Sequence, residues 1–159
     1  MALRKILTEG DETLRKKSRP VTEVNDRIRS MLDDLTDTMR DANGVGLAAP
    51  QVGILRRMFV VQVDPEGPVF ELINPEIISR EGDQYGEEGC LSVPGYIGMV
   101  HRAEKVRVRG LNRNGNPVEY EADGLLARAF QHEYDHLDGV LYTQKADDIH
   151  YAAEEDEDK

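Results

Sequence analysis

The residues in this chain whose types and spacing could do chemistry are two histidines and a glutamate: His132, Glu133 and His136. On a helix, residues at i and i+4 lie one turn apart on the same face, so the two imidazoles could bind one metal ion. Glu133 directly follows the first histidine and could take a proton from a water at an open position of that ion. The pattern therefore predicts metal-assisted hydrolysis.

The sequence around this pattern predicts the helix that it requires. No proline interrupts the run, and Gly124 and Gly139 flank it. Apolar residues and candidate ligands recur at helical spacing, namely Leu125, Leu126, Ala129, Phe130, His132, Glu133, His136 and Leu137. A five-residue match is also compatible with a buried helix whose histidines bind nothing, so the metal site needs a third ligand.

The third ligand is expected upstream of this helix. A metzincin would have a further histidine downstream, where this chain has Tyr142, and only a short tail remains to supply a glutamate from a second helix. The only cysteine, Cys90, is the strongest candidate, because a thiolate with two imidazoles leaves one tetrahedral position open for water. His101 and His150 are alternatives, but neither has ligand spacing.

A run of small and apolar residues at 44–53 has a single amide side chain, Gln51. Its opening matches the dinucleotide-binding pattern Gly-x-Gly-x-x-Ala, but that motif must follow a strand and begin a helix, whereas here a predicted helix precedes it. Because Pro50 favours an extended conformation at Ala49, we interpret the run as backbone that lies close to a ligand.

Three segments together resemble the signature motifs of bacterial peptide deformylases in order and spacing. They are Gly-Val-Gly-Leu-Ala-Ala-Pro-Gln at 44–51, Glu-Gly-Cys-Leu-Ser at 88–92 and Gln-His-Glu-Tyr-Asp-His at 131–136. The resemblance extends from about Ile6 to about Leu141. Two positions depart from it: Arg128 stands where some relatives have an apolar residue, and Ile97 stands where many have arginine.

The resemblance implies a hydrolase acting on linear amides, which removes the N-formyl group from the initiator formyl-methionine of nascent polypeptides and releases formate. It implies three metal ligands, which are Cys90, His132 and His136. Metal-bound water would be the nucleophile and Glu133 the general base and then acid, while the Gln51 side chain and the Leu91 backbone N–H would stabilise the oxyanion. Substrate contacts are implied for Gly44, Val45, Gly46, Glu88, Leu125 and Ala129.

The surroundings of the site and its metal are less closely defined by the sequence. Asp135 and Glu88 could orient the metal ligands, and Arg102 could pair with Glu88. Each of these three residues could instead be an ordinary charged residue on the surface. The ligand set suits zinc, cobalt, nickel or iron, and the residues alone favour zinc. The resemblance implies one Fe²⁺ per chain, with Zn²⁺, Ni²⁺ or Co²⁺ as substitutes.

The remaining patterns predict an α+β fold. A helix is expected from about Thr22 to Asn43-Gly44, and two strand pairs are expected at 58–63 with 69–74 and at 105–110 with 118–122. We therefore expect short antiparallel or mixed sheets around a central metal-binding helix, with the N-terminal helix packed outside. Residues 1–146 are expected to form one catalytic domain, and residues 147–159 a short acidic tail that is flexible.

Composition limits the partners. The net charge is −11, from 20 basic and 31 acidic residues, so we expect no sequence-specific nucleic-acid binding. Because the C-terminal tail is acidic, we expect only weak electrostatic docking on ribosomal RNA through that tail. The lone cysteine, the absence of a signal-peptide pattern and the absence of an apolar run of membrane length predict a cytoplasmic protein that contacts no membrane. The expected partners are N-formylmethionyl peptides and nascent chains at the ribosome, and the expected state is a monomer.

Two other classes of protein remain compatible with these residues. One is a different metallohydrolase, such as a small protease or a deacetylase. The other is a non-enzymatic protein with a structural metal, in which Glu133 would have no catalytic role. Gln51 and its segment are evidence against both. An amide donor beside a three-ligand site has no purpose in a structural centre, and the glycines of this segment leave little reason for a large acyl pocket.

Overall fold

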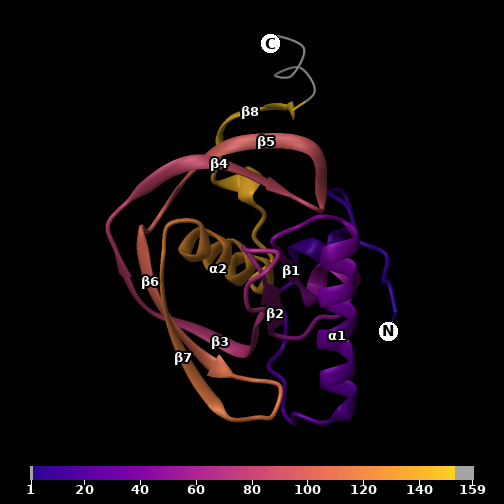
Figure 1. Ribbon diagram of the computed structural model, residues 1–159. Helices are drawn as coiled ribbons and strands as arrows, with labels where there is room; N and C mark the ends of the chain where they lie inside the picture. The colour runs from indigo at the N-terminus through magenta and orange to yellow at the C-terminus, as the bar shows by residue number, and fades with distance from the viewer. Residues whose placement is uncertain (1, 153–159) are drawn as a thin grey trace.

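The computed structural model describes residues 2–152. The helix α2 (Gly124–Leu137) lies at the centre, strands curve around it, and α1 (Asp26–Asp41) lies at one side (Figure 1). The described residues also form three short 3₁₀ helices: η1 (Glu12–Arg15), η2 (Ala49–Val52) and η3 (Tyr142–Gln144). Within residues 2–152, no helix is both long enough and apolar enough to cross a bilayer.

The larger sheet has five strands in the order β1, β2, β3, β6, β7, and every neighbouring pair is antiparallel. These strands are β1 (Gly46–Ala48), β2 (Met58–Val61), β3 (Phe70–Glu81), β6 (Lys105–Leu111) and β7 (Pro117–Asp123). Both predicted strand pairs are confirmed, with Met58 opposite Ile73 and Val108 opposite Tyr120. β3 continues past its predicted end because a register shift near Asn74 lets the chain bend and pair onward with β6.

The smaller sheet has three strands in the order β4 (Gln84–Cys90), β5 (Val93–Arg102) and β8 (Asp147–Tyr151). Cys90 ends β4 and lies opposite Val93, so a tight turn follows the cysteine directly. The expectation of a flexible tail from residue 147 is wrong for residues 147–151, because these residues pair with β5. Residues 153–159 of that expected tail lie outside the described part of the chain.

The first helix begins at Asp26, later than the predicted Thr22, because the Asn25 side chain accepts a hydrogen bond from the N–H of Ile28 at 3.1 Å and caps the first turn. It ends as predicted. Asn43 has a positive φ of 58°, and the N–H of Gly44 donates to the carbonyl of Met39 at 2.9 Å. This cap directs the chain into β1 and toward the site.

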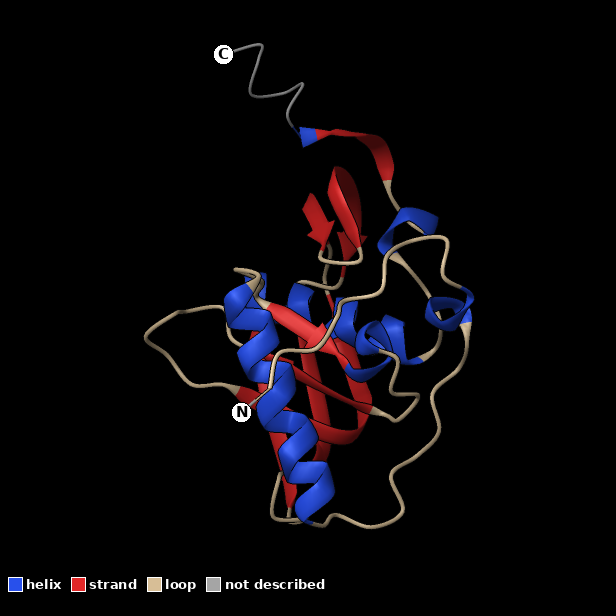
Figure 2. Cartoon of the chain, turned by 90° about the vertical axis from the view of Figure 1, so that its right-hand side faces the viewer, coloured by secondary structure: helices blue, strands red, loops and turns tan. Residues whose placement is uncertain are grey.

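The core lies on both faces of the larger sheet. Met58 and Val60 of β2 pack in the cluster that contains the apolar face of α1, whereas Phe59 and Val61 pack in the cluster that contains α2. Alternate residues of a strand point to opposite faces, which explains why this strand is apolar at every position. Figure 2 shows α1 lying across one face of the sheet. The expected α+β arrangement, with α2 central and α1 outside, is confirmed.

Candidate metal centre and substrate cavity

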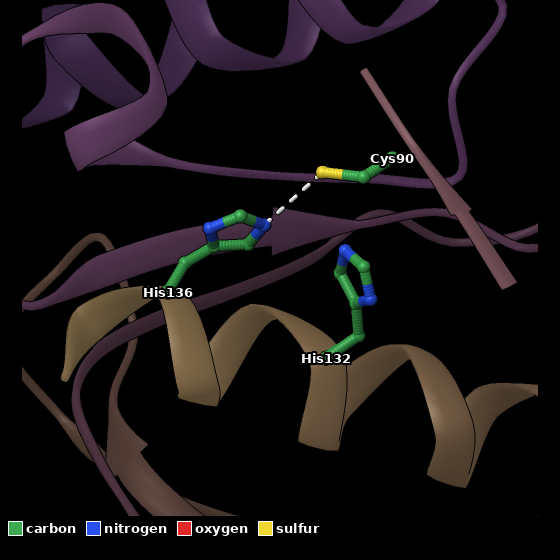
Figure 3. Close-up of side chains that lie close together, drawn as sticks. All are labelled: Cys90, His132 and His136. Carbon is green, nitrogen blue, oxygen red and sulfur yellow. Dashed lines mark hydrogen bonds between the residues drawn. The ribbon is translucent and has the colours of Figure 1, made fainter. Parts of the chain in front are cut away.

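The structure brings the three predicted metal ligands together from two elements. His132 and His136 extend from the same face of α2, and Cys90 approaches from the end of β4 (Figure 3). One ligand atom from each residue lies within 4.8 Å of the other two, and Cys90 Sγ is 3.3 Å from His136 Nε2. Both histidines are buried, and the cysteine is half-buried.

This donor set fits a metal ion. Tetrahedral bonds of about 2.0–2.3 Å place ligand atoms roughly 3.5 Å apart, which agrees with the observed spacing. The pKa of His136 lies well below its usual value, because the ring is buried and because His132 and Arg102 lie nearby. The imidazole is therefore held neutral, which is the form that binds a metal.

Glu88 fixes the orientation of the first histidine. Its Oε1 lies 2.7 Å from His132 Nδ1. Arg102 donates two hydrogen bonds to the Glu88 carboxylate, at 2.8 and 2.9 Å, and Arg128 Nη1 donates a third at 2.7 Å. Burial would raise the pKa of Glu88, but the hydrogen bonds and charges of Arg102 and His132 outweigh this effect and hold the pKa well below its usual range. Because an ionised carboxylate can only accept a hydrogen bond, His132 Nδ1 must carry the proton that it donates to Glu88. The other ring nitrogen, Nε2, is then free to bind a metal.

The same cluster of charges extends to the outer side of α2. Arg102 Nη1 donates to Asp135 at 2.6 Å, and Lys145 forms an ion pair with Asp135 at 2.9 Å. The suggested pairing of Arg102 with Glu88 is therefore present in the structure. The contact of Arg128 with Glu88 was not predicted from the sequence. The available signal was an arginine at position 128, where some relatives have an apolar residue.

Glu133 points into the same site. Its Oε2 lies 4.0 Å from His132 Nε2, and Oε1 has no hydrogen-bond partner among the described residues. Burial raises the pKa of Glu133 to about 7, the carboxylates of Glu88 and Asp135 add to this effect, and His132 and Arg102 oppose it. A carboxyl group with such a pKa can both accept and release a proton near neutral pH.

The first strand approaches Glu133 closely at Gly46. A Cβ atom placed on this glycine would lie 2.5 Å from Glu133 Oε2 and 2.9 Å from its carboxyl carbon. Any side chain at this position would therefore displace the carboxylate, so the glycine is explained by close packing against Glu133.

Gln51 is fully buried and has a defined amide orientation. Its Oε1 accepts a hydrogen bond from the N–H of Ala48 at 2.9 Å, so its Nε2 faces Ser92 Oγ at 3.0 Å and Cys90 Sγ at 3.5 Å. The expectation of an extended conformation at Ala49 is wrong, because Ala49 begins η2; the residue before it, Ala48, is extended. The tight turn of η2 directs the amide nitrogen toward the cysteine.

A cavity of about 520 Å³ opens in front of these side chains. Its lining includes Cys90, His132, Glu133, Gln51 and Leu91. It also includes all six predicted substrate contacts, which are Gly44, Val45, Gly46, Glu88, Leu125 and Ala129. His136 does not belong to the lining.

Part of the cavity wall was not predicted. Arg128 and Ala152 line it without having been assigned to it from the sequence, and so do the residues of the segment Val93–Ile97, which lie beside Cys90. The Pro94-Gly95 pair was the available signal, because these two residue types together mark a turn.

Comparison with known proteins identifies the family. The family model for polypeptide deformylase matches residues 3–151. A peptide deformylase of Symbiobacterium thermophilum is 52% identical over 160 residues, covering 100% of this chain and 74% of that protein. One of Alkaliphilus metalliredigens is 57% identical over 145 residues, covering 91% of this chain and 97% of that protein. The crystal structure of a peptide deformylase from Legionella pneumophila has a TM-score of 0.89 at 45% identity and covers 92% of this chain and 88% of its own. By sequence and by structure, the chain belongs to the polypeptide deformylase family.

Proposed function

We propose that this protein removes the N-formyl group from the initiator formyl-methionine of nascent polypeptides, giving formate and a free N-terminal methionine. The observation that carries the proposal is the placement of Glu133, with a pKa of about 7, in the same cavity as a cysteine and a histidine that can bind a metal. Membership of the deformylase family supports the choice of substrate.

Cys90, His132 and His136 would hold the metal. When bound, a divalent ion polarises a water molecule and lowers its pKa toward about 7. Glu133 takes the proton from the attacking water as general base. It then gives this proton to the leaving amine as general acid, which returns the carboxylate to its starting state.

Attack on the formyl carbonyl places negative charge on its oxygen. We assign the stabilisation of that charge to the Nε2 amide of Gln51 and the backbone N–H of Leu91. The assignment of Gln51 is supported by its hydrogen bond from Ala48, which fixes the amide so that Nε2 faces Cys90. A donor held in place before the reaction needs no reorganisation as the charge develops.

The methionine side chain would occupy the apolar part of the cavity, beside Val45, Leu125 and Ala129. β1 is an edge strand of the larger sheet, and Gly44 and Gly46 at its start line the cavity, which supports the binding of an extended peptide beside this strand. Glu88 lines the cavity and also contacts the ring of His132. We therefore assign it two roles, contact with the substrate and orientation of His132.

Replacing Gln51 with alanine is expected to lower kcat about 10²–10³-fold, because one oxyanion donor is lost. The isosteric variant Gln51→Glu keeps the acceptor for Ala48 but removes the donor, so it should be similarly impaired. Metal content should match the wild-type protein in both variants. Steady-state kinetics measures kcat, and metal analysis of the same preparations measures metal content. A kcat within threefold of wild type in Gln51→Glu would contradict the role of Gln51 as an oxyanion donor.

The proposed activity is tested with a formyl-Met-Ala-Ser peptide and its acetyl analogue, using protein purified without oxygen in the presence of iron. We expect rapid formate release, and cleavage of the acetyl peptide about 10–200-fold slower because the added methyl group does not fit. If protein with one bound metal released no formate, the proposal would be wrong, and a different metal-dependent amidase would be indicated.

We further propose Fe²⁺ as the native metal, one per chain, with Zn²⁺, Ni²⁺ or Co²⁺ as substitutes. The mixed thiolate and imidazole donors suit all of these ions, and the family resemblance favours iron. We also propose that the protein acts in the cytoplasm, as a monomer, on nascent chains emerging from the ribosome. The acidic net charge supports weak contact with ribosomal RNA.

A further inference from the structure

We propose that the N-terminal arm, defined as residues 2–9, positions the two oxyanion donors relative to each other. The arm would act through its backbone, by holding the segment of Gln51 and the segment of Leu91 at a fixed separation. Leu7 and Glu9 are its positioning residues. The inference rests on the proposed function, because it assigns a supporting element to the oxyanion site described there.

The first observation is a pair of backbone hydrogen bonds from alternate residues of the arm. The N–H of Leu7 donates to the carbonyl of Gln51 at 2.7 Å, and the N–H of Glu9 donates to the carbonyl of Ser92 at 2.7 Å. Alternate N–H groups of an extended chain face the same side, so one edge of the arm serves both partners. Gln51 belongs to η2, and Ser92 directly follows Leu91. The arm is therefore hydrogen-bonded to both segments that supply the donors.

The second observation is a bond that joins the same two segments inside the site. Gln51 Nε2 donates to Ser92 Oγ at 3.0 Å, and both side chains are fully buried. Together with the two backbone bonds of the arm, this bond closes a ring of three hydrogen bonds. A change in the separation of η2 and the turn after Cys90 would strain all three bonds together, so the ring fixes that separation.

The third observation is that the arm is held on either side of this contact. Arg4 Nε donates to Asp34 Oδ2 at 3.0 Å, and the Arg4 N–H donates to Thr38 Oγ1 at 3.0 Å. Asp34 and Thr38 are buried residues of α1, beside which the chain begins (Figure 2). Beyond the arm, Leu14 of η1 is fully buried. The stretch between these two anchors therefore has little freedom to move away from the site.

The fourth observation separates the arm from the substrate. None of residues 2–9 lines the cavity, and none belongs to the metal-binding cluster. Loss of the arm's hydrogen bonds should therefore change the placement of the donors and leave the substrate contacts in place. An oxyanion donor acts only within about 2.7–3.1 Å of the charged oxygen, and a misplacement of about 1 Å can lower a rate about 10²-fold. The effect should appear in kcat rather than in KM.

The test removes one backbone N–H at a time with proline, which has no N–H to donate. Leu7→Pro is compared with Leu7→Ala, and Glu9→Pro with Glu9→Ala, because each alanine variant shortens the side chain but keeps the N–H. For formyl-Met-Ala-Ser we expect kcat of each proline variant to be about 10–10²-fold below that of its alanine partner. KM should stay within about twofold, and metal content should match the alanine partner.

Thr8→Pro is the matched control, because it makes the same backbone change between the two positions. Among the described residues, the Thr8 N–H has no hydrogen-bond partner. An extended conformation at the preceding residue is also the one that proline favours. Thr8→Pro should therefore lower kcat by less than about twofold.

A second measurement separates positioning from a general loss of structure. In the Gln51→Ala background the donor that the arm holds is absent, so Leu7→Pro should lower kcat there by less than about twofold. A general loss of structure would lower kcat by the same factor in both backgrounds. If Leu7→Pro fails to fold, Arg4→Ala replaces it, since this variant loosens the anchor on α1 and keeps every N–H of the arm. Its expected loss in kcat is about 3–10-fold with Gln51 present and less than about twofold without it.

Three results would overturn the inference while the proposed function stands. They are equal kcat values for Leu7→Pro and Leu7→Ala, an equal loss in Thr8→Pro, and the same factor of loss with and without Gln51. Equal kcat values for Arg4→Ala and the wild-type protein would do so where Leu7→Pro does not fold. Failure of the wild-type protein to release formate would instead overturn the proposed function, and this inference with it.

Discussion

Replacing Glu133 with glutamine is expected to slow formate release from formyl-Met-Ala-Ser by about 10²–10⁴-fold while the metal remains bound. Glutamine has nearly the same volume and fits beside Gly46, but it cannot take a proton from water or return one to the leaving amine. The effect should appear in kcat, because the cavity and the metal ligands are unchanged. Steady-state kinetics and metal analysis of the same preparation measure both quantities.

Glu119→Gln is the control for this experiment, since it makes the same chemical change on an exposed face of β7. Its activity should equal that of the wild-type protein. If Glu133→Gln retained full activity with one metal per chain, Glu133 would not be the base. A protein that bound its metal and showed no formate release before or after the substitution would contradict the proposed function and leave both a different amidase and a structural metal as explanations.

Replacing Cys90 with serine is expected to lower metal affinity by more than the 10–100-fold that loss of an outer partner causes, and to abolish activity with it. A serine hydroxyl stays protonated near neutral pH and is a poor substitute for a thiolate. Because Cys90 is only half-buried and serine has a similar shape, the fold should persist in the circular dichroism spectrum. Metal content after purification without oxygen, and competition with a chelator, give the affinity.

His101→Gln is the control for this change, because His101 is an exposed histidine whose ring contacts Asp83 and takes no part in the cluster. Its metal content should match the wild-type protein, in which iron should predominate. Unfolding of Cys90→Ser would favour a structural metal, and an unchanged affinity would remove Cys90 from the ligand set. Zinc as the main metal in the wild-type protein would contradict the choice of Fe²⁺.

The parts of the fold that the sequence predicted are those that depend on local patterns. The helix α2 follows from apolar spacing between two glycines, and the two strand pairs follow from β-branched runs on either side of short turns. The grouping of Cys90 with the two histidines was predicted because few residues in the chain can bind a metal, so elimination was effective.

The smaller sheet was not predicted, for a physical reason. β4 contains glycines and charged residues and has no apolar alternation, and β8 pairs with β5 across a long stretch of intervening chain. Such pairing is determined by tertiary contacts rather than by the strand's own preference. The bend at Gly95 and the contact of Arg128 with Glu88 depend on that sheet, so both became visible only in the structure.

The hydrogen bonds that converge on Glu88 have a consequence for how the protein acquires its ion. His132 is already turned into its ligand orientation by protein contacts alone, so metal loading requires little ordering of side chains. Because this orientation is set by Glu88 and not by an ion, it does not by itself favour one divalent metal over another. The ion found in the purified enzyme would then record which metals the cell had available during synthesis, as much as any selectivity of the chain itself.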